Sequence, residues 1–346
     1  MSQFPIDLIS DTSTRPSAGM LQAMANAETG DEQRGEDPTT LALCERMADT
    51  LGMEDAIFLP SGTMCNQISF LVHCRPGDEI LAAENAHIVR SEGAGASALA
   101  GAQIRGIPTT SGIFTADDVT ARLNRKRDRA PVSRLISVEQ TSNSGGGAIW
   151  PLETLRELVA LKQQRELILH MDGARLFNAT TASGIAAAKM CQGFDSVWVD
   201  LSKGLGCPVG AVLAGSKDFI ARAWVWKHRL GGAMRQSGVI AAAGLHALDN
   251  NIDRLSQDHD NARLLATLLA DTPGLRAFPR EPETNILFLD IADSGHNTAQ
   301  MAPRLAEHGV RLNAESEFLF RAVTHLDISN AQIRQAASAT RASLSV

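Results

Sequence analysis

Two polar side chains of this sequence follow short apolar runs, and together they suit the chemistry of an aldehyde cofactor. Asp172 ends the run 167–171, and Lys203 comes a few residues after the run 197–199. In open parallel sheets, ligands gather at the carboxyl ends of the strands. A lysine amine there can form a Schiff base with an aldehyde, and an aspartate can keep a pyridine nitrogen protonated so that the ring accepts electrons. The pair therefore predicts pyridoxal 5'-phosphate (PLP) chemistry.

Each of these residues also has an ordinary structural interpretation, because a single lysine after a strand usually lies on the surface and a single aspartate there usually caps a turn. A second feature favours the functional interpretation. Ser61, Gly62 and Thr63 follow one predicted strand and open a predicted helix, where free N–H groups can bind phosphate. Arg235 supplies a further cation beside a glycine turn. Alone, these two features would indicate a helix cap and a loop.

The elements that must position these residues alternate along the first two thirds of the chain. Short apolar runs predict strands, and longer periodic segments predict helices. Strands that alternate with helices are typical of an α/β domain with a parallel sheet buried on both faces. The predicted strands are 56–59, 79–82, 135–138, 167–171 and 197–199, and the predicted helices are 41–51, 63–74 and 152–164.

After about residue 245 the pattern changes to fewer strands between longer helices. The sequence predicts a helix over 239–269, a strand over 285–290, a helix over 298–308 and a strand over 323–328. We therefore expect a large cofactor-binding domain over 1–245, whose N-terminal segment contributes to the substrate site, and a smaller α+β domain over 246–346.

Composition narrows the classes of function. The 346 residues carry a formal net charge of −7, which argues against a nucleic-acid partner, and no apolar run is long enough to span a membrane. The five cysteines lack zinc spacing, so we expect reduced thiols, no metal site and a cytoplasmic protein whose N-terminus is not a signal peptide. Tyrosine is absent, so no phenol can take part in the chemistry.

Eight short motifs, in the same order over nearly the whole length, resemble the L-threonine aldolase family within the fold-type-I PLP enzymes, which are aspartate-aminotransferase-like. No single motif is specific, but their ordered combination is. The motifs are Ser-Asp-Thr at 10–12, Gly-Glu-Asp-Pro-Thr at 35–39, Ser-Gly-Thr at 61–63, Ala-His at 86–87, Asp-Gly-Ala-Arg at 172–175, Leu-Ser-Lys-Gly at 201–204, Met-Arg-Gln-Ser-Gly at 234–238 and Arg-Ala-Val-Thr-His-Leu-Asp at 321–327.

This resemblance implies roles around the cofactor. Lys203 matches the lysine that forms the Schiff base, and Asp172 matches the partner of the pyridine nitrogen. Gly62 and Thr63 match the phosphate loop, and Ser202 matches a residue beside the cofactor.

The resemblance also implies roles toward the substrate and the neighbouring subunit. Arg175, Ser10 and Arg321 match the groups that hold the substrate carboxylate, and Arg175 also counts among the cofactor contacts. His87 matches the histidine stacked on the cofactor ring, near the substrate hydroxyl. Arg235 matches a phosphate ligand that a neighbouring subunit lends.

The implied activity is PLP-dependent retro-aldol cleavage of L-threonine, L-allo-threonine and related β-hydroxy-α-amino acids to glycine and an aldehyde. The implied assembly is a homotetramer of close dimers with active sites at the dimer interface. Two other interpretations stay open: another fold-type-I reaction, such as β-elimination, racemisation or transamination, and a PLP-binding protein without catalysis. Two departures from the family pattern bear on substrate range, because Arg34 stands where many members have tyrosine and Ser142 where many have histidine.

Overall fold

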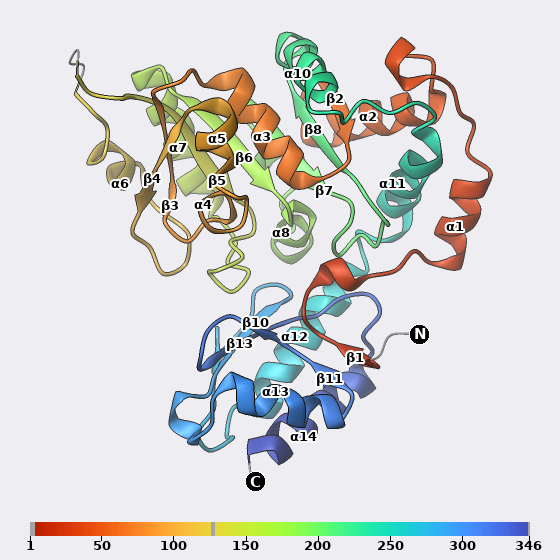
Figure 1. Cartoon of the computed structure of the whole chain (residues 1–346), viewed down its shortest axis with the longest axis vertical. Helices are drawn as coiled ribbons and strands as arrows, with labels where there is room; N and C mark the ends of the chain where they lie inside the picture. The colour runs from red at the N-terminus through yellow and green to blue at the C-terminus, as the bar shows by residue number, and fades with distance from the viewer. Residues whose placement is uncertain (1–3, 126–128, 345–346) are drawn as a thin grey trace.

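The structure is a computed structural model that describes residues 4–125 and 129–344. A seven-stranded sheet forms the core of its larger lobe (Figure 1). The strand order is β2-β8-β7-β6-β5-β3-β4. Neighbours from β7 to β4 pair in parallel, and β8 alone runs antiparallel to both of its neighbours. The predicted α/β class with a mostly parallel sheet is therefore confirmed. The strands are β2 (Asp55–Leu59), β3 (Asp78–Ala83), β4 (Gln103–Ile107), β5 (Val132–Glu139), β6 (Ile168–Gly173), β7 (Ser196–Asp200) and β8 (Ala211–Gly215).

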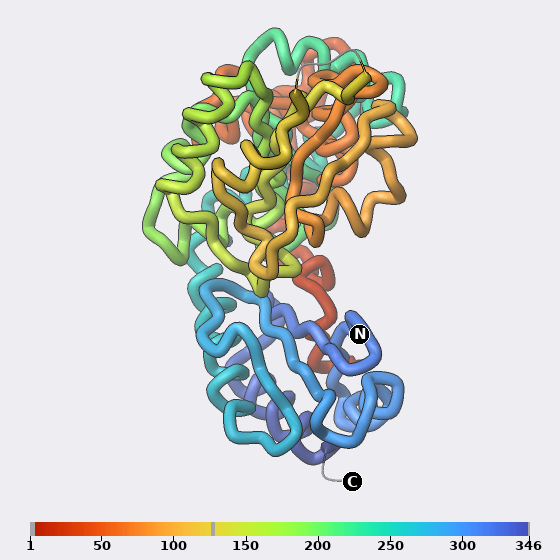
Figure 2. Tube along the Cα trace, turned by 90° about the vertical axis from the view of Figure 1, so that its left-hand side faces the viewer, coloured from red at the N-terminus to blue at the C-terminus, as the bar shows by residue number. Residues whose placement is uncertain are grey.

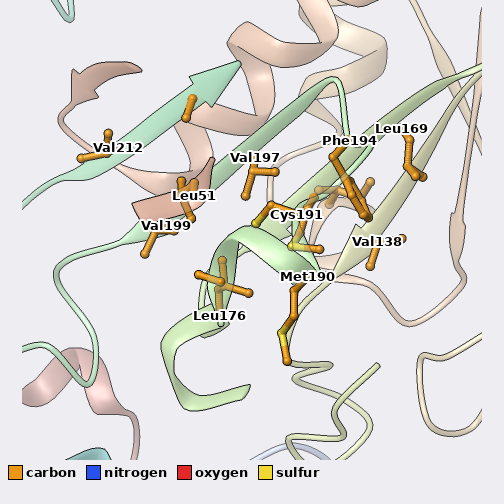
Figure 3. Close-up of a cluster of buried hydrophobic side chains, with 14 of the residues drawn as sticks. Leu51, Val138, Leu169, Leu176, Met190, Cys191, Phe194, Val197, Val199 and Val212 are labelled. Carbon is orange, nitrogen blue, oxygen red and sulfur yellow. The ribbon is translucent and has the colours of Figure 1, made fainter. Parts of the chain in front are cut away.

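Helices cover this sheet because its strands bury side chains on both faces. On β2, Ile57 and Leu59 pack with α3 and α10, whereas Phe58 packs in the large central cluster. Val197, Val199 and Leu169 belong to that central cluster, which Figure 3 shows beside α8 and α9. The helices are α1 (Ala18–Ala25), α2 (Pro38–Leu51), α3 (Gly62–His73), α4 (His87–Arg90), α5 (Gly95–Ala100), α6 (Ala116–Thr120), α7 (Leu152–Arg165), α8 (Leu176–Ser183), α9 (Ala187–Met190), α10 (Lys217–Arg229) and α11 (Gly238–Asn250).

The smaller lobe is the lower one in Figures 1 and 2. It has its own four-stranded antiparallel sheet and its own apolar cluster. The strand order is β12-β13-β10-β9. The chain's first strand also lies here, because β1 pairs in parallel with β11 and buries Ile6 and Leu8 in this cluster. The elements are β1 (Ile6–Asp7), α12 (Leu255–Leu269), β9 (Arg276–Phe278), β10 (Ile286–Asp290), α13 (Thr298–Glu307), β11 (Val310–Arg311), β12 (Asn313–Ala314), β13 (Leu319–Val323) and α14 (Asn330–Leu344); short 3₁₀ turns occur at Asp11–Ser13, Glu32–Arg34 and Ala292–Ser294.

Two predicted elements of the C-terminal third are wrong in extent. The helix predicted over 239–269 is two helices, because the chain leaves helical pairing after Asn250 and the side chain of Asn251 donates to the backbone oxygen of Leu205. The strand predicted over 323–328 lies earlier, as β13, because Val323 is its last residue and its N–H pairs with the carbonyl of Leu8. Both errors arise from long-range contacts that local periodicity does not encode.

No helix of the described residues is both long enough and apolar enough to cross a membrane. The five cysteines are free thiols, four of them buried. The division into domains at residue 245 stays a proposal, and the place of β1 shows that the smaller lobe also takes chain from the N-terminus.

Candidate active site

A cavity of about 270 Å³ lies at the carboxyl ends of β5, β6 and β7, beside the first turn of α3. It brings together nine of the ten residues that the sequence predicted for the site. Segments far apart in the chain meet here, since Ser10 comes from the N-terminal segment and Arg321 from β13. The nine are Ser10, Gly62, Thr63, His87, Asp172, Arg175, Ser202, Lys203 and Arg321.

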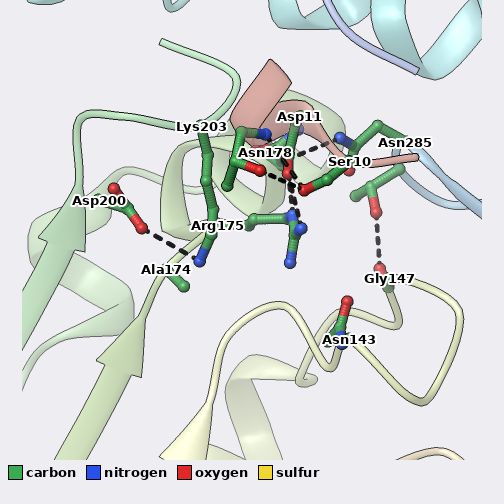
Figure 4. Close-up of polar contacts among 12 residues, drawn as sticks. Ser10, Asp11, Asn143, Gly147, Ala174, Arg175, Asn178, Asp200, Lys203 and Asn285 are labelled. Atoms are coloured by element: carbon green, nitrogen blue, oxygen red, sulfur yellow. Dashed lines mark hydrogen bonds and ion pairs between the residues drawn. The ribbon is translucent and has the colours of Figure 1, made fainter. Parts of the chain in front are cut away.

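Lys203 lies in the loop after β7, with its amine held by a carboxylate that ends the same strand. Its Nζ lies 3.1 Å from Oδ2 of Asp200 (Figure 4). The other oxygen of Asp200 accepts hydrogen bonds from the N–H and the hydroxyl of Ser202, at 2.9 and 2.8 Å. Asp200, which sequence reasoning missed, therefore fixes both residues of the Ser202-Lys203 pair. Its place as the last residue of β7 was the available signal.

Asp172 is a buried acid whose charge calls for a cationic partner. Its Oδ2 accepts from the side-chain amide of Asn66 at 2.9 Å, and its Oδ1 accepts from the N–H of Ala174 at 3.1 Å. Burial, followed by the nearby carboxylate of Glu139, raises the pKa of Asp172 to about 7, although Lys203 opposes this shift. A protonated ring nitrogen beside Asp172 would favour the ionised acid, so the residue fits the expected cofactor.

The N-terminus of the twelve-residue helix α3 lines one part of the cavity. Ser61 caps the helix by accepting the N–H of Met64 at 3.2 Å. The first N–H groups of a helix have no partner within it and favour an anion, which suits Gly62 and Thr63. Position 62 must be glycine, since a Cβ there would lie 2.2 Å from the ring of Trp198.

Two arginines, Arg175 and Arg321, also line the cavity. The guanidinium of Arg175 donates through Nε and Nη2 to both oxygens of Asp11, each at 2.7 Å. Although burial alone would raise the pKa of Asp11, this guanidinium holds it well below its usual range. Figure 4 shows Arg175 lying between Asp11 and Asn143. Asp11 therefore orients Arg175. It lies within the Ser-Asp-Thr motif at 10–12, but the sequence alone did not predict a role for it.

Arg321 lines the cavity beside Arg175 and has one buried nitrogen that the described part of the chain leaves unpaired. Its Nη1 donates to Oδ1 of Asn143 at 3.1 Å and contacts Glu315 at 3.2 Å. Among the described residues its buried Nε has no hydrogen-bond partner. Burial, followed by repulsion from Arg175, lowers the pKa of Arg321. A carboxylate between the two guanidinium groups would relieve that repulsion and satisfy the free donors.

His87 opens the short helix α4 at the rim of the cavity. Its N–H donates to Glu139 at 2.6 Å, and its Nδ1 lies 2.9 Å from Oε1 of Glu92. The hydrogen bond to Glu92 raises the pKa of His87, against the effect of burial. The side-chain ligand atoms of His87, Glu92 and Asp172 all lie within 4.8 Å of one another. Glu92 is buried and was missed, because nothing near it in sequence marks it.

Arg235 is the one predicted site residue that a single chain does not bring to the cavity. Its Nη1 pairs with Oδ2 of Asp31 at 2.7 Å, and 61% of its side chain is exposed. The two departures from the family pattern also lie outside the cavity lining. Arg34 is exposed and lies 3.6 Å from Asp31, and the hydroxyl of the buried Ser142 accepts the N–H of Gly145.

Comparisons with known proteins agree with this geometry. The sequence model of the Beta-eliminating lyase family matches residues 7–294. The low specificity L-threonine aldolase of Escherichia coli (strain K12) is 41% identical over 340 residues, which cover 98% of this chain and 99% of that protein. The threonine aldolase of Leishmania major has a TM-score of 0.83 at 19% identity, covering 98% of this chain and 99% of that one. An aspartate aminotransferase double mutant of Thermus thermophilus has a TM-score of 0.73 at 16% identity, covering 98% and 91%. The expected fold-type-I architecture is thereby confirmed.

Proposed function

The chain belongs to the Beta-eliminating lyase family, as a relative of the low-specificity L-threonine aldolases, and on that premise we propose how its own residues perform the reaction. It is a carbon–carbon lyase that uses PLP to cleave L-threonine and related β-hydroxy-α-amino acids to glycine and an aldehyde. The observation that carries the assignment of its site is one cavity lined by Lys203, the buried Asp172 and two arginines.

Cofactor binding is assigned to four groups in the cavity. Lys203 would supply the amine that bonds to the aldehyde of PLP, and the carboxylate of Asp172 would accept a hydrogen bond from the protonated ring nitrogen. The first turn of α3, at Gly62 and Thr63, receives the phosphate. Ser202 lies beside the cofactor, held by Asp200. When bound, PLP accepts the electron pair that the breaking Cα–Cβ bond releases.

Substrate orientation is assigned to the arginines. Arg175 and Arg321, with the hydroxyl of Ser10, hold the substrate carboxylate by hydrogen bonds that suit its two oxygens. Holding the carboxylate in this way would fix the orientation of the Cα–Cβ bond toward the cofactor. The buried pair of Arg175 with Asp11 keeps one guanidinium in place before substrate arrives.

The base for the β-hydroxyl is assigned to His87. In the neutral ring, Nδ1 donates to Glu92 and Nε2 is left as the acceptor. Nε2 can then take the hydroxyl proton, directly or through one water, as the Cα–Cβ bond breaks. Glu92 stabilises the imidazolium that results.

The proposed reaction is tested by its products. Purified protein with PLP is incubated with L-threonine, L-allo-threonine and phenylserine, and glycine and each aldehyde are quantified. We expect glycine and aldehyde in equal amounts from at least the two threonine isomers. Ammonia and a keto acid without glycine would instead show β-elimination, and an unchanged substrate would contradict catalysis altogether.

We also propose that the protein assembles into a homotetramer. A homotetramer of close dimers in the cytoplasm would let a neighbouring subunit bring Arg235 to the phosphate, and this residue is exposed and away from the cavity of its own chain. The free cysteines are compatible with a reducing compartment.

Mixed subunits test the origin of Arg235. Lys203→Ala and Arg235→Ala should each be poorly active alone, but their co-assembled mixture should recover activity. In a mixed dimer, the site that keeps Lys203 takes Arg235 from the other subunit and is complete. We expect recovered activity, measured as glycine formed per subunit, up to about half that of the wild type in a fully mixed dimer. A mixture no more active than the sum of the two variants would show that Arg235 acts within its own chain.

A further inference from the structure

A line of buried hydrogen bonds runs from the cavity along the face of the sheet that α3 covers. From Asp172, it passes through Asn66 to Nε2 of His170 at 3.1 Å. Nδ1 of His170 lies 2.8 Å from Oγ of Ser196, which lies 2.9 Å from Nε2 of His73. Asn66, His170 and Ser196 have no exposed surface. We call His73, Ser196, His170 and Asn66 the relay.

One neighbour fixes the direction of every hydrogen bond in the relay. The indole Nε1 of Trp198, which can only donate, lies 2.7 Å from Oδ1 of Asn66. The amide of Asn66 must therefore turn Oδ1 toward Trp198 and its NH₂ toward the cavity. His170 must then donate from Nε2, because Oδ1 can only accept.

The tautomers of both histidines follow from this. Burial lowers the pKa of His170 and of His73 to about 3, so both rings are neutral near pH 7. With its proton on Nε2, His170 accepts from Ser196 at Nδ1, and Ser196 in turn accepts from Nε2 of His73. Every donor in the relay thus points toward Asp172, an arrangement in which each hydrogen bond polarises the next.

The cavity end of the relay lies between two acids. The two hydrogens of the Asn66 amide reach Asp172 at 2.9 Å and Glu92 at 2.7 Å. Glu92 also accepts from Gln67 and His87. A reversed amide would present an oxygen to two carboxylates and an NH₂ to the indole donor. The orientation of Asn66 therefore acts directly on the charge of Asp172.

We propose that Asn66 is a positioning residue for Asp172, and that His73, Ser196 and His170 hold its amide in the orientation that favours the ionised form of Asp172 and aims it at the cofactor. This inference rests on the proposed pairing of Asp172 with the ring nitrogen of PLP. The relay opposes the burial and the repulsion from Glu139 and Glu92 that favour the neutral acid, and Lys203 acts in the same sense as the relay.

The direct test measures the pH at which Asp172 ionises in the full chain freed of PLP. The infrared carboxyl stretch reports it, with Asp172→Asn as the blank. In Asn66→Leu we expect the proton affinity of Asp172 to rise by at least about tenfold, because the hydrogen bond from Asn66 to the charged carboxylate is lost. For Ser196→Ala we expect a smaller shift in the same direction, since the amide keeps its place but loses the polarising donors. The second variant removes only one hydroxyl, so it keeps the test decisive if the first fails to fold.

Two further variants separate positioning from general damage. Ser69→Ala removes a buried hydroxyl that lies on α3 outside the relay and donates to the backbone oxygen of Cys65. This variant should leave the ionisation of Asp172 unchanged. His170→Gln keeps an N–H near the position of Nε2 but loses the hydrogen bond with Ser196, so it should shift about as far as Ser196→Ala. His170→Phe loses both hydrogen bonds and should shift further.

PLP affinity, measured by equilibrium titration, distinguishes the role of the relay from the proposed pairing of Asp172 with the ring nitrogen. If the proposal holds, the variants that raise the proton affinity of Asp172 also bind PLP more weakly and show a shifted pH profile of cofactor absorbance. If Asp172 ionises at the wild-type pH in both Asn66→Leu and Ser196→Ala, the relay has no such role. If the ionisation shifts but PLP binds as tightly as before, the relay stands and the pairing of Asp172 with the ring nitrogen is wrong.

Discussion

Replacing Lys203 by alanine should lower turnover of L-threonine by at least about 10⁴-fold, the scale on which removal of a covalent nucleophile acts. The variant loses the amine that bonds to the cofactor, so the visible absorbance of lysine-bound PLP should disappear. PLP itself should still bind, more weakly, because Asp172 and the first turn of α3 are unchanged. Absorbance spectra, PLP titration and glycine formation measure the three effects.

Lys162→Ala is a matched control for that experiment. Its side chain is 17% exposed, as is that of Lys203, and its Nζ also pairs with an aspartate, Asp195, at 2.7 Å. It lies at the opposite end of the sheet from the cavity, so activity should be near that of the wild type. Wild-type turnover in Lys203→Ala, with a thermal unfolding midpoint that shows an intact fold, would overturn the assignment.

Local sequence features predicted five of the seven strands of the sheet, because those strands contain short apolar runs. β4 was missed because only one of its five residues is buried. The strands around Asp172 and before Lys203 were expected within a few residues of their observed ends. β8 was missed, although it is equally apolar, because its antiparallel insertion between β2 and β7 depends on pairing that no local pattern shows. The helix that breaks after Asn250 was missed for the same kind of reason.

The site was predicted as far as its residues carry chemistry of their own. An arginine, a lysine or a histidine can be recognised as a candidate from its type and its motif. Asn66, Glu92 and Asp200 act by holding such residues, and their roles come from contacts between positions far apart in the chain, such as Asn66 with Asp172. Arg235 shows the opposite limit, since the motif identifies it but one chain does not place it in the cavity.

Replacing Asp172 by asparagine should lower turnover by about 10³-fold, because breaking a buried charged pair costs about 3–5 kcal/mol and each 1.4 kcal/mol is a factor of ten. The amide keeps the size of the acid but cannot hold a proton on the ring nitrogen. Both of its neighbours, the N–H of Ala174 and the NH₂ of Asn66, are donors. The new NH₂ group therefore meets a donor in either orientation, which adds a cost of about 1–3 kcal/mol.

The same substitution has a pH signature in protein freed of PLP. The folded-state pKa of Asp172 is raised to about 7 from its usual 3.8, so the folded state binds the extra proton between these values. The free energy of unfolding of the wild type, relative to Asp172→Asn, should therefore fall as the pH rises from about 4 to about 7. Asp290→Asn is the contrasting control, because hydrogen bonds from the backbone of Ala292 and from Arg276 lower the pKa of Asp290. Its difference should therefore rise with pH below about 4 and stay flat from about 4 to about 7. Denaturant unfolding of the three proteins from about pH 3 to about pH 7 measures both differences. A flat difference for Asp172→Asn between about pH 4 and about pH 7 would mean that the fold leaves the pKa of Asp172 at its usual value.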